Sequence, residues 1–388
     1  LYSSAASDVY KRQGLGGAAQ WPLLRLDSAD IGIDLSFLNA SDKPAGRLGM
    51  VRAEGDRLVL PDGTPLRFWG TNLAAATLFN TPRDRVPAQA RRLARLGFNL
   101  VRIHHHDSPW TYPNIFGDPS TQGTRRIDPR SRAALDWWIK CLQDEGIRIW
   151  VDLHVQRHVK ASDQIEWFEE LPRAYDHGHR DIKGFSYVNR SLQAAMDEFA
   201  AAYLSAVNPH TQRSLLNDPA VVAVQITNEN DVTHHFGNSL LPDKNVPRHN
   251  AAYMAAAERF AAQARLPRDK VWRSWEAGPS KYFLNDLEAA FNRDRIARLR
   301  ALGLKTPLST TSQWGDSPLS SLPALTLGEI IDVHSYATAG ELERNPALQG
   351  GITHFVSTSQ IINRPLTLSE WNMGRFPEPD RHTLPIYM

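Results

Sequence analysis

Short apolar runs alternate with amphipathic stretches along most of the chain, which is the pattern of parallel strands joined by helices. The clearest run is 220–227 (AVVAVQIT), which is continuously apolar apart from its end, as in a strand buried on both faces. The predicted strands are 66–70, 99–104, 147–153, 220–227, 307–311, 330–333 and 365–368. Helices with one apolar face are predicted at 86–96, 131–145, 191–207, 251–264 and 282–302.

The chain before these units predicts a smaller structure. Residues 47–72 contain two turn signals, Glu54-Gly55-Asp56 and Pro61-Asp62-Gly63, between short apolar runs, and therefore predict a β-hairpin. Residues 1–13 (LYSSAASDVYKRQ) resemble translated adaptor sequence, so we expect 1–20 to be a non-native or disordered leader. We expect 21–46 to be an irregular segment and 47–388 to form one domain.

The order of the elements predicts an α/β fold, a (β/α)8 TIM barrel that lacks its eighth strand. The 18 residues after Glu370 leave no room for another helix and strand, so we expect a fragment that is incomplete at its C-terminus. Its first and last strands would then lie unpaired at an open seam, and unpaired apolar edges recruit other chains.

Polar side chains gather where the predicted strands end. An open nucleotide-binding sheet needs a glycine-rich loop after its first strand, but Gly70-Thr71-Asn72-Leu73 lacks one, and no GxxxxGK[ST] motif is present. Polar groups at the carboxyl ends of many strands are typical of a barrel active site. They are Asn72, 102–107, Asp152, His154, Asn228, Glu229, Trp314, His334, Tyr336, Glu370 and Trp371.

Two of these strand ends carry a glutamate. Glu229 follows the most apolar strand, in Ile226-Thr227-Asn228-Glu229-Asn230, and Glu370 follows the last strand, in Thr367-Leu368-Ser369-Glu370-Trp371. A single glutamate at a strand end is as often a cap or an ion-pair partner as a catalytic group. A pair on strands four and seven can face each other across the barrel mouth, as glycoside hydrolysis requires.

The motifs resemble those of a clan A glycoside hydrolase, most closely the cellulase family (family 5). The resemblance covers about 47–377 and rests on six segments in the family's order: LVLPDGTPLRFWGTN, GFNLVRIH, VDLH, ITNEN, DVHSY and LSEWN. It implies a retaining mechanism in which Glu229 is the general acid/base and Glu370 the nucleophile.

The same resemblance implies roles for the neighbouring side chains. Asn228 is expected to hydrogen-bond the sugar 2-hydroxyl, and Arg102 to keep the nucleophile ionised and oriented. His154, His334 and Tyr336 are expected to line the sugar subsite, with Tyr336 hydrogen-bonded to Glu370. The acid must be protonated near neutral pH, so Glu229 is expected in an apolar or like-charged setting.

Other histidines and tryptophans have competing interpretations. His104, His105 and His106 invite a metal hypothesis, but successive residues of a strand point to opposite faces, so we predict no metal site. His234-His235 follows the acid/base loop and is either a substrate contact or a solvated loop pair. Trp371, beside the nucleophile, is the best candidate for stacking on a sugar; Trp110, Trp167 and Trp314 are equally well explained as core residues.

Composition limits the other classes of function. The chain is 42% hydrophobic and 22% charged, which excludes wholesale disorder, and its net charge of +2 gives no electrostatic case for nucleic acid or anionic membranes. No apolar run is long enough to cross a bilayer. The single cysteine, Cys141, excludes an internal disulfide and a cysteine-based zinc cluster, and in its amphipathic helix it is expected to be buried.

We therefore predict a retaining hydrolase of β-linked glycans of the glucan or mannan type, which needs no cofactor and no protein partner. The alternatives are an exo-acting β-galactosidase or β-mannosidase of the same clan, and a carbohydrate-binding barrel without catalysis. A non-catalytic barrel should have lost one of the two glutamates, and both are present. The compartment is not visible in the sequence; for the full-length protein we expect secretion or a periplasmic location.

Overall fold

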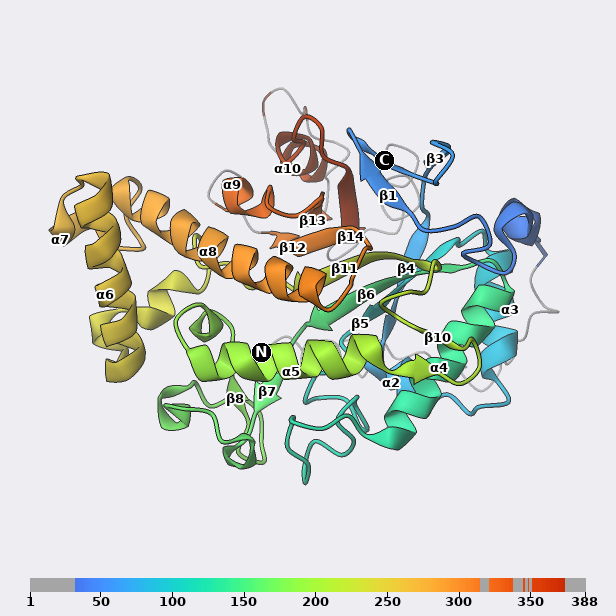
Figure 1. The fold of residues 1–388 in the computed structure, drawn as a ribbon, viewed down its shortest axis with the longest axis horizontal. Helices are drawn as coiled ribbons and strands as arrows, with labels where there is room; N and C mark the ends of the chain where they lie inside the picture. The colour runs from blue at the N-terminus through green and yellow to red at the C-terminus, as the bar shows by residue number, and fades with distance from the viewer. Residues whose placement is uncertain (1–31, 315–320, 338–344, 346–347, 349–350, 374–388) are drawn as a thin grey trace, which may run out of the picture.

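Seven parallel strands form a nearly closed barrel at the centre of the molecule (Figure 1). The computed structural model describes residues 32–314, 321–337, 345, 348 and 351–373. The strands are hydrogen-bonded in the order β14-β13-β12-β11-β6-β5-β4. Their bounds are β4 Gly70–Ala74, β5 Leu100–His104, β6 Arg148–His154, β11 Val221–Thr227, β12 Leu308–Gln313, β13 Ile330–Ala337 and β14 Leu366–Met373. The predicted (β/α)8-type fold with seven strands is confirmed.

The central strands are covered on both faces, which explains their composition. Every residue of β6 and β11 is buried, as the apolar run of β11 predicted. β12 is buried throughout as well, although its sequence is LSTTSQ. Two of its polar side chains have partners inside the barrel: Gln225 donates to the Ser312 hydroxyl at 2.5 Å, and the Ser321 hydroxyl donates to Gln313 at 2.6 Å. The buried hydroxyls of Ser309 and Thr310 have no hydrogen-bond partner among the described residues. A sequence this polar lacks the apolar run by which the other buried strands are recognised.

Helices cover the outside of the barrel close to their predicted positions (Figure 1). The main ones are α3 Val86–Arg95, α4 Pro129–Asp144, α5 Arg190–Ser205 and α8 Pro279–Ala301. Asp128 caps the N-terminus of α4: its carboxylate accepts from the Arg130 and Ser131 amides at 2.9 Å each. Cys141 of α4 is buried, as expected. None of the helices in the described part of the chain is long and apolar enough to span a membrane.

The segment before the barrel closes its amino-terminal side. The predicted irregular segment contains one 3-10 helix, η3 Ser36–Asp42. The Asp42 carboxylate accepts a hydrogen bond from the buried Arg148 side chain at 2.6 Å. The predicted hairpin is a three-stranded sheet of β1 Arg52–Glu54, β2 Arg57–Val59 and β3 Pro65–Leu66. The leader at 1–20 lies outside the described residues.

The predicted strand 66–70 is wrong, because the chain breaks there into β3 and β4. The Asn99 side chain takes the backbone hydrogen bonds in between: its oxygen accepts from the Trp69 amide at 2.8 Å, and its nitrogen donates to the Arg67 carbonyl at 2.9 Å. A side chain that competes for backbone groups interrupts a strand without any change in the apolar pattern.

A second apolar cluster lies beyond the barrel, built from the two long connections after β6 and β11. It joins Val159, Phe185, Tyr253, Phe283 and other buried residues. Figure 1 shows α6 and α7 at the outer end of the long helix α8. The remaining elements are α2 Ala75–Asn80, α6 Pro247–Ala264, α7 Arg268–Val271, α9 Leu322–Leu325, α10 Ile352–Thr358, β7 His158–Val159, β8 Arg180–Asp181, β9 Val207–Asn208, β10 Arg213–Ser214, η4 Ala161–Asp163, η5 Phe168–Glu170, η6 Phe185–Tyr187, η7 Gly237–Leu240 and η8 Pro242–Lys244.

The barrel has an open seam between β4 and β14. Each strand is paired on one side only, and no strand among the described residues lies between them. Their carboxyl ends approach, since the Asn72 side chain donates to the Ser369 carbonyl at 3.2 Å. The predicted absence of an eighth strand concerns residues 374–388, which lie outside the described part of the chain.

Candidate active site

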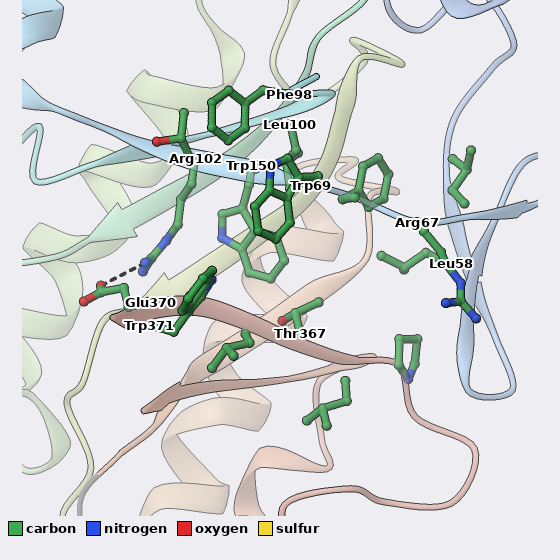
Figure 2. A pocket seen from close by; sticks show the side chains of 18 of the residues that line it. Leu58, Arg67, Trp69, Phe98, Leu100, Arg102, Trp150, Thr367, Glu370 and Trp371 are labelled. Atoms are coloured by element: carbon green, nitrogen blue, oxygen red, sulfur yellow. Dashed lines mark hydrogen bonds and ion pairs between the residues drawn. The ribbon is translucent and has the colours of Figure 1, made fainter. Parts of the chain in front are cut away.

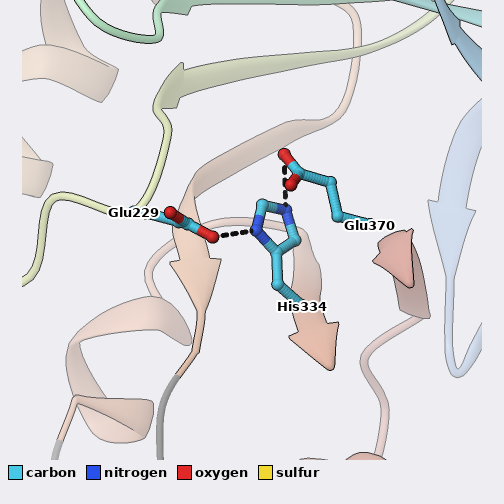
Figure 3. A group of neighbouring side chains, drawn as sticks. All are labelled: Glu229, His334 and Glu370. Carbon is cyan, nitrogen blue, oxygen red and sulfur yellow. Dashed lines mark hydrogen bonds and ion pairs between the residues drawn. The ribbon is translucent and has the colours of Figure 1, made fainter. Parts of the chain in front are cut away.

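Glu229 and Glu370 converge on one histidine at the barrel mouth. An oxygen of Glu229, a nitrogen of His334 and an oxygen of Glu370 all lie within 4.8 Å of one another (Figure 3). Glu229 follows β11 with a φ of +46°, in the left-handed region that non-glycine residues rarely adopt. Such a conformation costs about 1–3 kcal/mol and is typical of functional sites.

A register shift in β14 aims Glu370 into the barrel. Thr367 and Ser369 face inward, because both hydroxyls donate to the buried Asp332, at 2.7 and 2.6 Å. Strict alternation would then point Glu370 outward. The register shifts between Val333 and His334, however, so that Glu370 lies opposite His334. Irregularities of this kind commonly re-aim a side chain next to an active site.

Three donors hold the Glu370 carboxylate. One oxygen accepts from Arg102 at 2.9 Å and lies 2.9 Å from Nε2 of His104, while the other accepts from the Tyr336 hydroxyl at 2.8 Å. The Arg102 and Tyr336 contacts are those expected from the sequence. Burial opposes ionisation, but the hydrogen bond with His104 and the charges of His334 and Arg102 hold the pKa of Glu370 well below its usual range. The group is therefore a carboxylate at neutral pH.

The buried Asp152 contacts two of the residues that bind Glu370, Arg102 and His104. Its carboxylate accepts from Arg102 at 3.1 Å, lies 2.7 Å from Nδ1 of His104, and accepts from the Trp150 indole at 3.1 Å. Burial works against its charge, but Arg102 and His104 keep the pKa of Asp152 below the ordinary value. Sequence analysis placed Asp152 and His104 among the polar strand ends but assigned neither a contact with Glu370. The spacing Arg102-x-His104 was a usable signal, because residues two apart on a strand share a face.

His334 lies between the two glutamates. Its Nδ1 is 2.6 Å from Glu229, and its Nε2 is 3.0 Å from the Ser369 hydroxyl and 3.5 Å from both Asp332 and Glu370. Burial lowers its pKa, but hydrogen bonds with Asp332 and Glu229 and the nearby carboxylates raise it to about 9. Glu229 therefore has the expected like charge nearby, the Glu370 carboxylate within 4.8 Å, together with the His334 imidazole, whose raised pKa favours its cationic form.

The remaining predicted site residues divide into two groups. Asn228 is buried beside the pair, and its side-chain oxygen accepts from Arg102 at 2.8 Å. His154 lies elsewhere: its ring packs 5.4 Å from Phe199 of α5, and burial holds its pKa well below the usual value. His154 is the last residue of β6, where it still pairs with Thr227 of β11.

Trp371 faces the open seam rather than the glutamate pair. A cavity of about 1120 Å³ occupies the seam and reaches Arg102, Tyr336 and Glu370 at its inner end (Figure 2). Its lining includes three tryptophans; Trp371 lies 6.1 Å from Trp69 between ring centroids, with Trp150 nearby. The cavity thus connects Glu370 with the space between β4 and β14.

The histidines near the site are poor metal ligands in this arrangement. The rings of His104 and His105 lie 4.2 Å apart between centroids, but the three imidazoles have different partners. His104 contacts Glu370, His105 lies 2.7 Å from the Ser108 hydroxyl, and His106 stacks 5.1 Å from Tyr203. The cluster of Glu229, His334 and Glu370 has metal-like spacing. A doubly protonated imidazole has no lone pair for a metal, however, so the raised pKa of His334 opposes coordination.

Fold and site together define a TIM-type barrel with two facing carboxylates at its carboxyl-end mouth. No protein-family model and no curated protein matches the sequence. In fold, the chain is similar to an endo-1,4-beta-mannanase from Rhizomucor miehei, with a TM-score of 0.52 and 13% identity over 84% of this chain and 82% of that chain. It is also similar to a glycoside hydrolase family 5 mannosidase from the same organism, with a TM-score of 0.52 and 12% identity over 87% of this chain and 76% of that chain. At these identities the likeness shows the fold.

Proposed function

We propose that this chain is a retaining glycoside hydrolase that cleaves β-linked glycans with Glu370 as nucleophile and Glu229 as general acid/base. The observation that carries the proposal is the approach of these two carboxyl groups, with oxygens within 4.8 Å. Retaining enzymes hold the pair about 5–5.5 Å apart, whereas inverting enzymes need about 6.5–9.5 Å to admit a water.

The contacts around each carboxylate support these roles. Glu370, ionised and held by Arg102, His104 and Tyr336, attacks the anomeric carbon while Glu229 gives its proton to the departing oxygen. A glycosyl ester then joins the sugar to Glu370. Glu229, now a carboxylate, takes a proton from water as that water attacks the same carbon, and Glu370 is released. Asn228, buried beside Arg102, is the donor that we assign to the sugar 2-hydroxyl.

For the substrate we propose a β-linked mannan or glucan. The support is the fold likeness to proteins described as an endo-1,4-beta-mannanase and a family 5 mannosidase. Exo action on a β-mannoside uses the same two glutamates and is the second candidate. A non-catalytic barrel is disfavoured, because both glutamates are present and the nucleophile has three donors in place.

The test is hydrolysis of β-mannan, β-glucan and aryl β-glycosides by the 388-residue chain, with Glu229→Gln and Glu370→Gln as paired inactive variants. We expect activity in the parent chain only, and NMR of the first product should give the β anomer. An α anomer would contradict retention. Activity that survives Glu370→Gln would contradict the assignment of the nucleophile.

A further inference from the structure

One face of α8 contacts the loop that follows Glu229. The residues of this face recur at intervals of three and four positions: Lys281, Leu284, Glu288 and Phe291. The Lys281 ammonium donates to the Thr233 carbonyl. A Cβ atom built on Gly237 would lie 3.4 Å from the Leu284 side chain, so the loop backbone passes close to the helix.

Tyr187 of η6 connects the same face with the residue after Glu229. Its ring packs 4.7 Å from the Phe291 ring between centroids, and its hydroxyl donates to the Asn230 carbonyl. The Asn230 amide donates in turn to the Thr311 hydroxyl at 3.1 Å. The helix therefore supports the loop at its start, through Tyr187, and further along, through Lys281 and Leu284.

Glu288 is the unusual member of this face. Its side chain is fully buried, and neither carboxyl oxygen has a hydrogen-bond partner among the described residues. A buried carboxyl without a partner remains protonated, because an isolated charge is far more costly to bury. The titratable groups that face it are Asp231 of the loop and Tyr187 of η6. Burial and the Asp231 charge raise the pKa of Glu288 well above its usual value, whereas the Val232 backbone amide acts in the opposite direction.

Asp231, in contrast, is a carboxylate around which the loop is ordered. It accepts from the backbone amides of His234 and His235, at 2.8 and 3.2 Å, and from the Trp314 indole at 3.1 Å. Burial opposes its charge, but the hydrogen bond and the charge of His235 hold the pKa of Asp231 below the ordinary value. A second negative charge at Glu288 would repel this carboxylate and disturb the loop.

We propose that Glu288 is a positioning residue for the general acid: its side chain supports residues 231–233 and so fixes the loop that carries Glu229. It does so as a neutral acid. The inference rests on the proposed function and adds to it a residue of α8, outside the barrel mouth. A carboxyl in an apolar cluster costs stability that an apolar side chain would not, and such residues are retained where function needs them.

Leaving groups separate a positioning role from a general loss of structure. Glu288→Ala should lower kcat/KM for a β-linked tetrasaccharide at least about tenfold, because a displaced Glu229 protonates the departing sugar poorly. For a dinitrophenyl β-glycoside, whose leaving group needs no proton, kcat/KM should change less than about threefold. Glu288→Gln, which is neutral and of equal size, should recover most of the loss.

The matched control is Asp286→Ala, which removes an exposed carboxylate from the same helix and should lose nothing on either substrate. Glu288→Asp withdraws the carboxyl by one methylene and gives the same comparison if Glu288→Ala does not fold. Equal losses on both substrates, or no loss on either, would overturn the positioning role.

Urea unfolding tests the charge state without any substrate. A carboxyl whose pKa is raised above 4.5 in the folded state makes the unfolding constant rise by up to about tenfold per pH unit between the two pKa values. Glu288→Gln cannot ionise, so it should be more stable than the parent chain at about pH 8, with a difference that shrinks toward about pH 4. Asp286→Asn should show no such trend. Parallel profiles of Glu288→Gln and the parent chain would mean that Glu288 is charged in the folded protein, and would overturn the proposal.

If the parent chain hydrolyses neither substrate, the proposed function fails, and hydrogen exchange then decides whether Glu288 orders the loop. Amide exchange in peptides that cover 229–236 should be at least about tenfold faster in Glu288→Ala than in the parent chain or Asp286→Ala. Peptides of α4 should exchange at an unchanged rate. Unchanged exchange in the loop, or an equal increase throughout the chain, would contradict the positioning role.

Discussion

At the scale of single residues, the site is a chain of carboxylates and donors in which each charge has a partner. Asp152 holds Arg102 and His104, which in turn hold Glu370. A second series of contacts connects Asp332 with Glu229. The Ser369 hydroxyl donates to Asp332 and contacts His334, and His334 contacts Glu229. Side chains that are fixed by such a second layer of contacts keep the reacting groups in place without reorganisation during the reaction.

Substitution of the two glutamates should give opposite rescue patterns. Glu370→Ala should lower kcat by roughly 10⁴-fold, and added azide or formate should restore turnover with inverted product, because a small anion fills the vacated space. Glu229→Ala should spare the first step for substrates with good leaving groups, which need no proton. Product anomers, followed by NMR with and without azide, check the assignment; the reverse pattern would mean that the roles are swapped.

His104→Ala should shift the acidic limb of the pH profile. The hydrogen bond with His104 helps to keep the pKa of Glu370 low, so its loss should raise that pKa and move the acidic decline of kcat/KM to higher pH. We expect kcat to fall about 10–100-fold, with little change in KM. Steady-state rates across pH measure the shift, with His210→Ala as the control, and an unmoved limb would show that His104 is not coupled to Glu370.

At the scale of elements, the free energy of unfolding should depend on pH through His334 of β13. Its pKa is raised from 6.5 to about 9 in the folded state. The extra stability is therefore fully present below about pH 6.5 and is lost as pH rises through about 9, and the shift corresponds to on the order of 3 kcal/mol. Urea unfolding at about pH 6 and pH 9.5 should show this loss in the parent chain. His334→Gln should be less stable at pH 6 and should lack that part of the pH dependence; identical pH profiles would refute the linkage.

The N-terminal cap of α4 gives a prediction that concerns stability alone. Asp128→Ala leaves the Arg130 and Ser131 amides without their carboxylate acceptor and should lower the free energy of unfolding by about 0.5–2 kcal/mol. Asp128→Asn, which retains an acceptor, should cost less. Urea unfolding of the two variants side by side tests the cap. Equal losses, or no loss, would show that the hydrogen bonds contribute little.

At the scale of the whole molecule, the barrel has a seam between β4 and β14. Among the described residues each of these strands has one unpaired edge, and Trp69, Trp150 and Trp371 line the cavity between them. Unpaired strands beside apolar walls are templates for another chain. We expect the chain to self-associate through this seam as its concentration rises.

Sedimentation over a range of concentrations tests this expectation. Trp69→Lys places a charge on the exposed wall of the seam, where 45% of the side chain is accessible, and should shift the chain toward monomer. Leu302→Lys, at a comparably exposed site at the end of α8, is the matched control and should not. Association that both variants leave unchanged would place the contact elsewhere.

The sequence by itself determined the strand order, most helix positions and the identity of the facing glutamates. It could do so because these features depend on local pattern: apolar periodicity for the elements, and the carboxyl end of a strand for Glu229 and Glu370. It also indicated the contacts of Arg102 and Tyr336 with Glu370, both of which the structure has.

Only the tertiary structure decided which side chains complete the site. Glu370 points inward because the register shifts beside His334, and a register is a relation between two strands. Asp152 and His104 join the nucleophile because β5 and β6 lie side by side, while the ring of His154 packs against α5. The contacts of His334 beside Glu229 depend on tertiary structure for the same reason. The three carboxylates around His334 come from three strands, which no local pattern brings together.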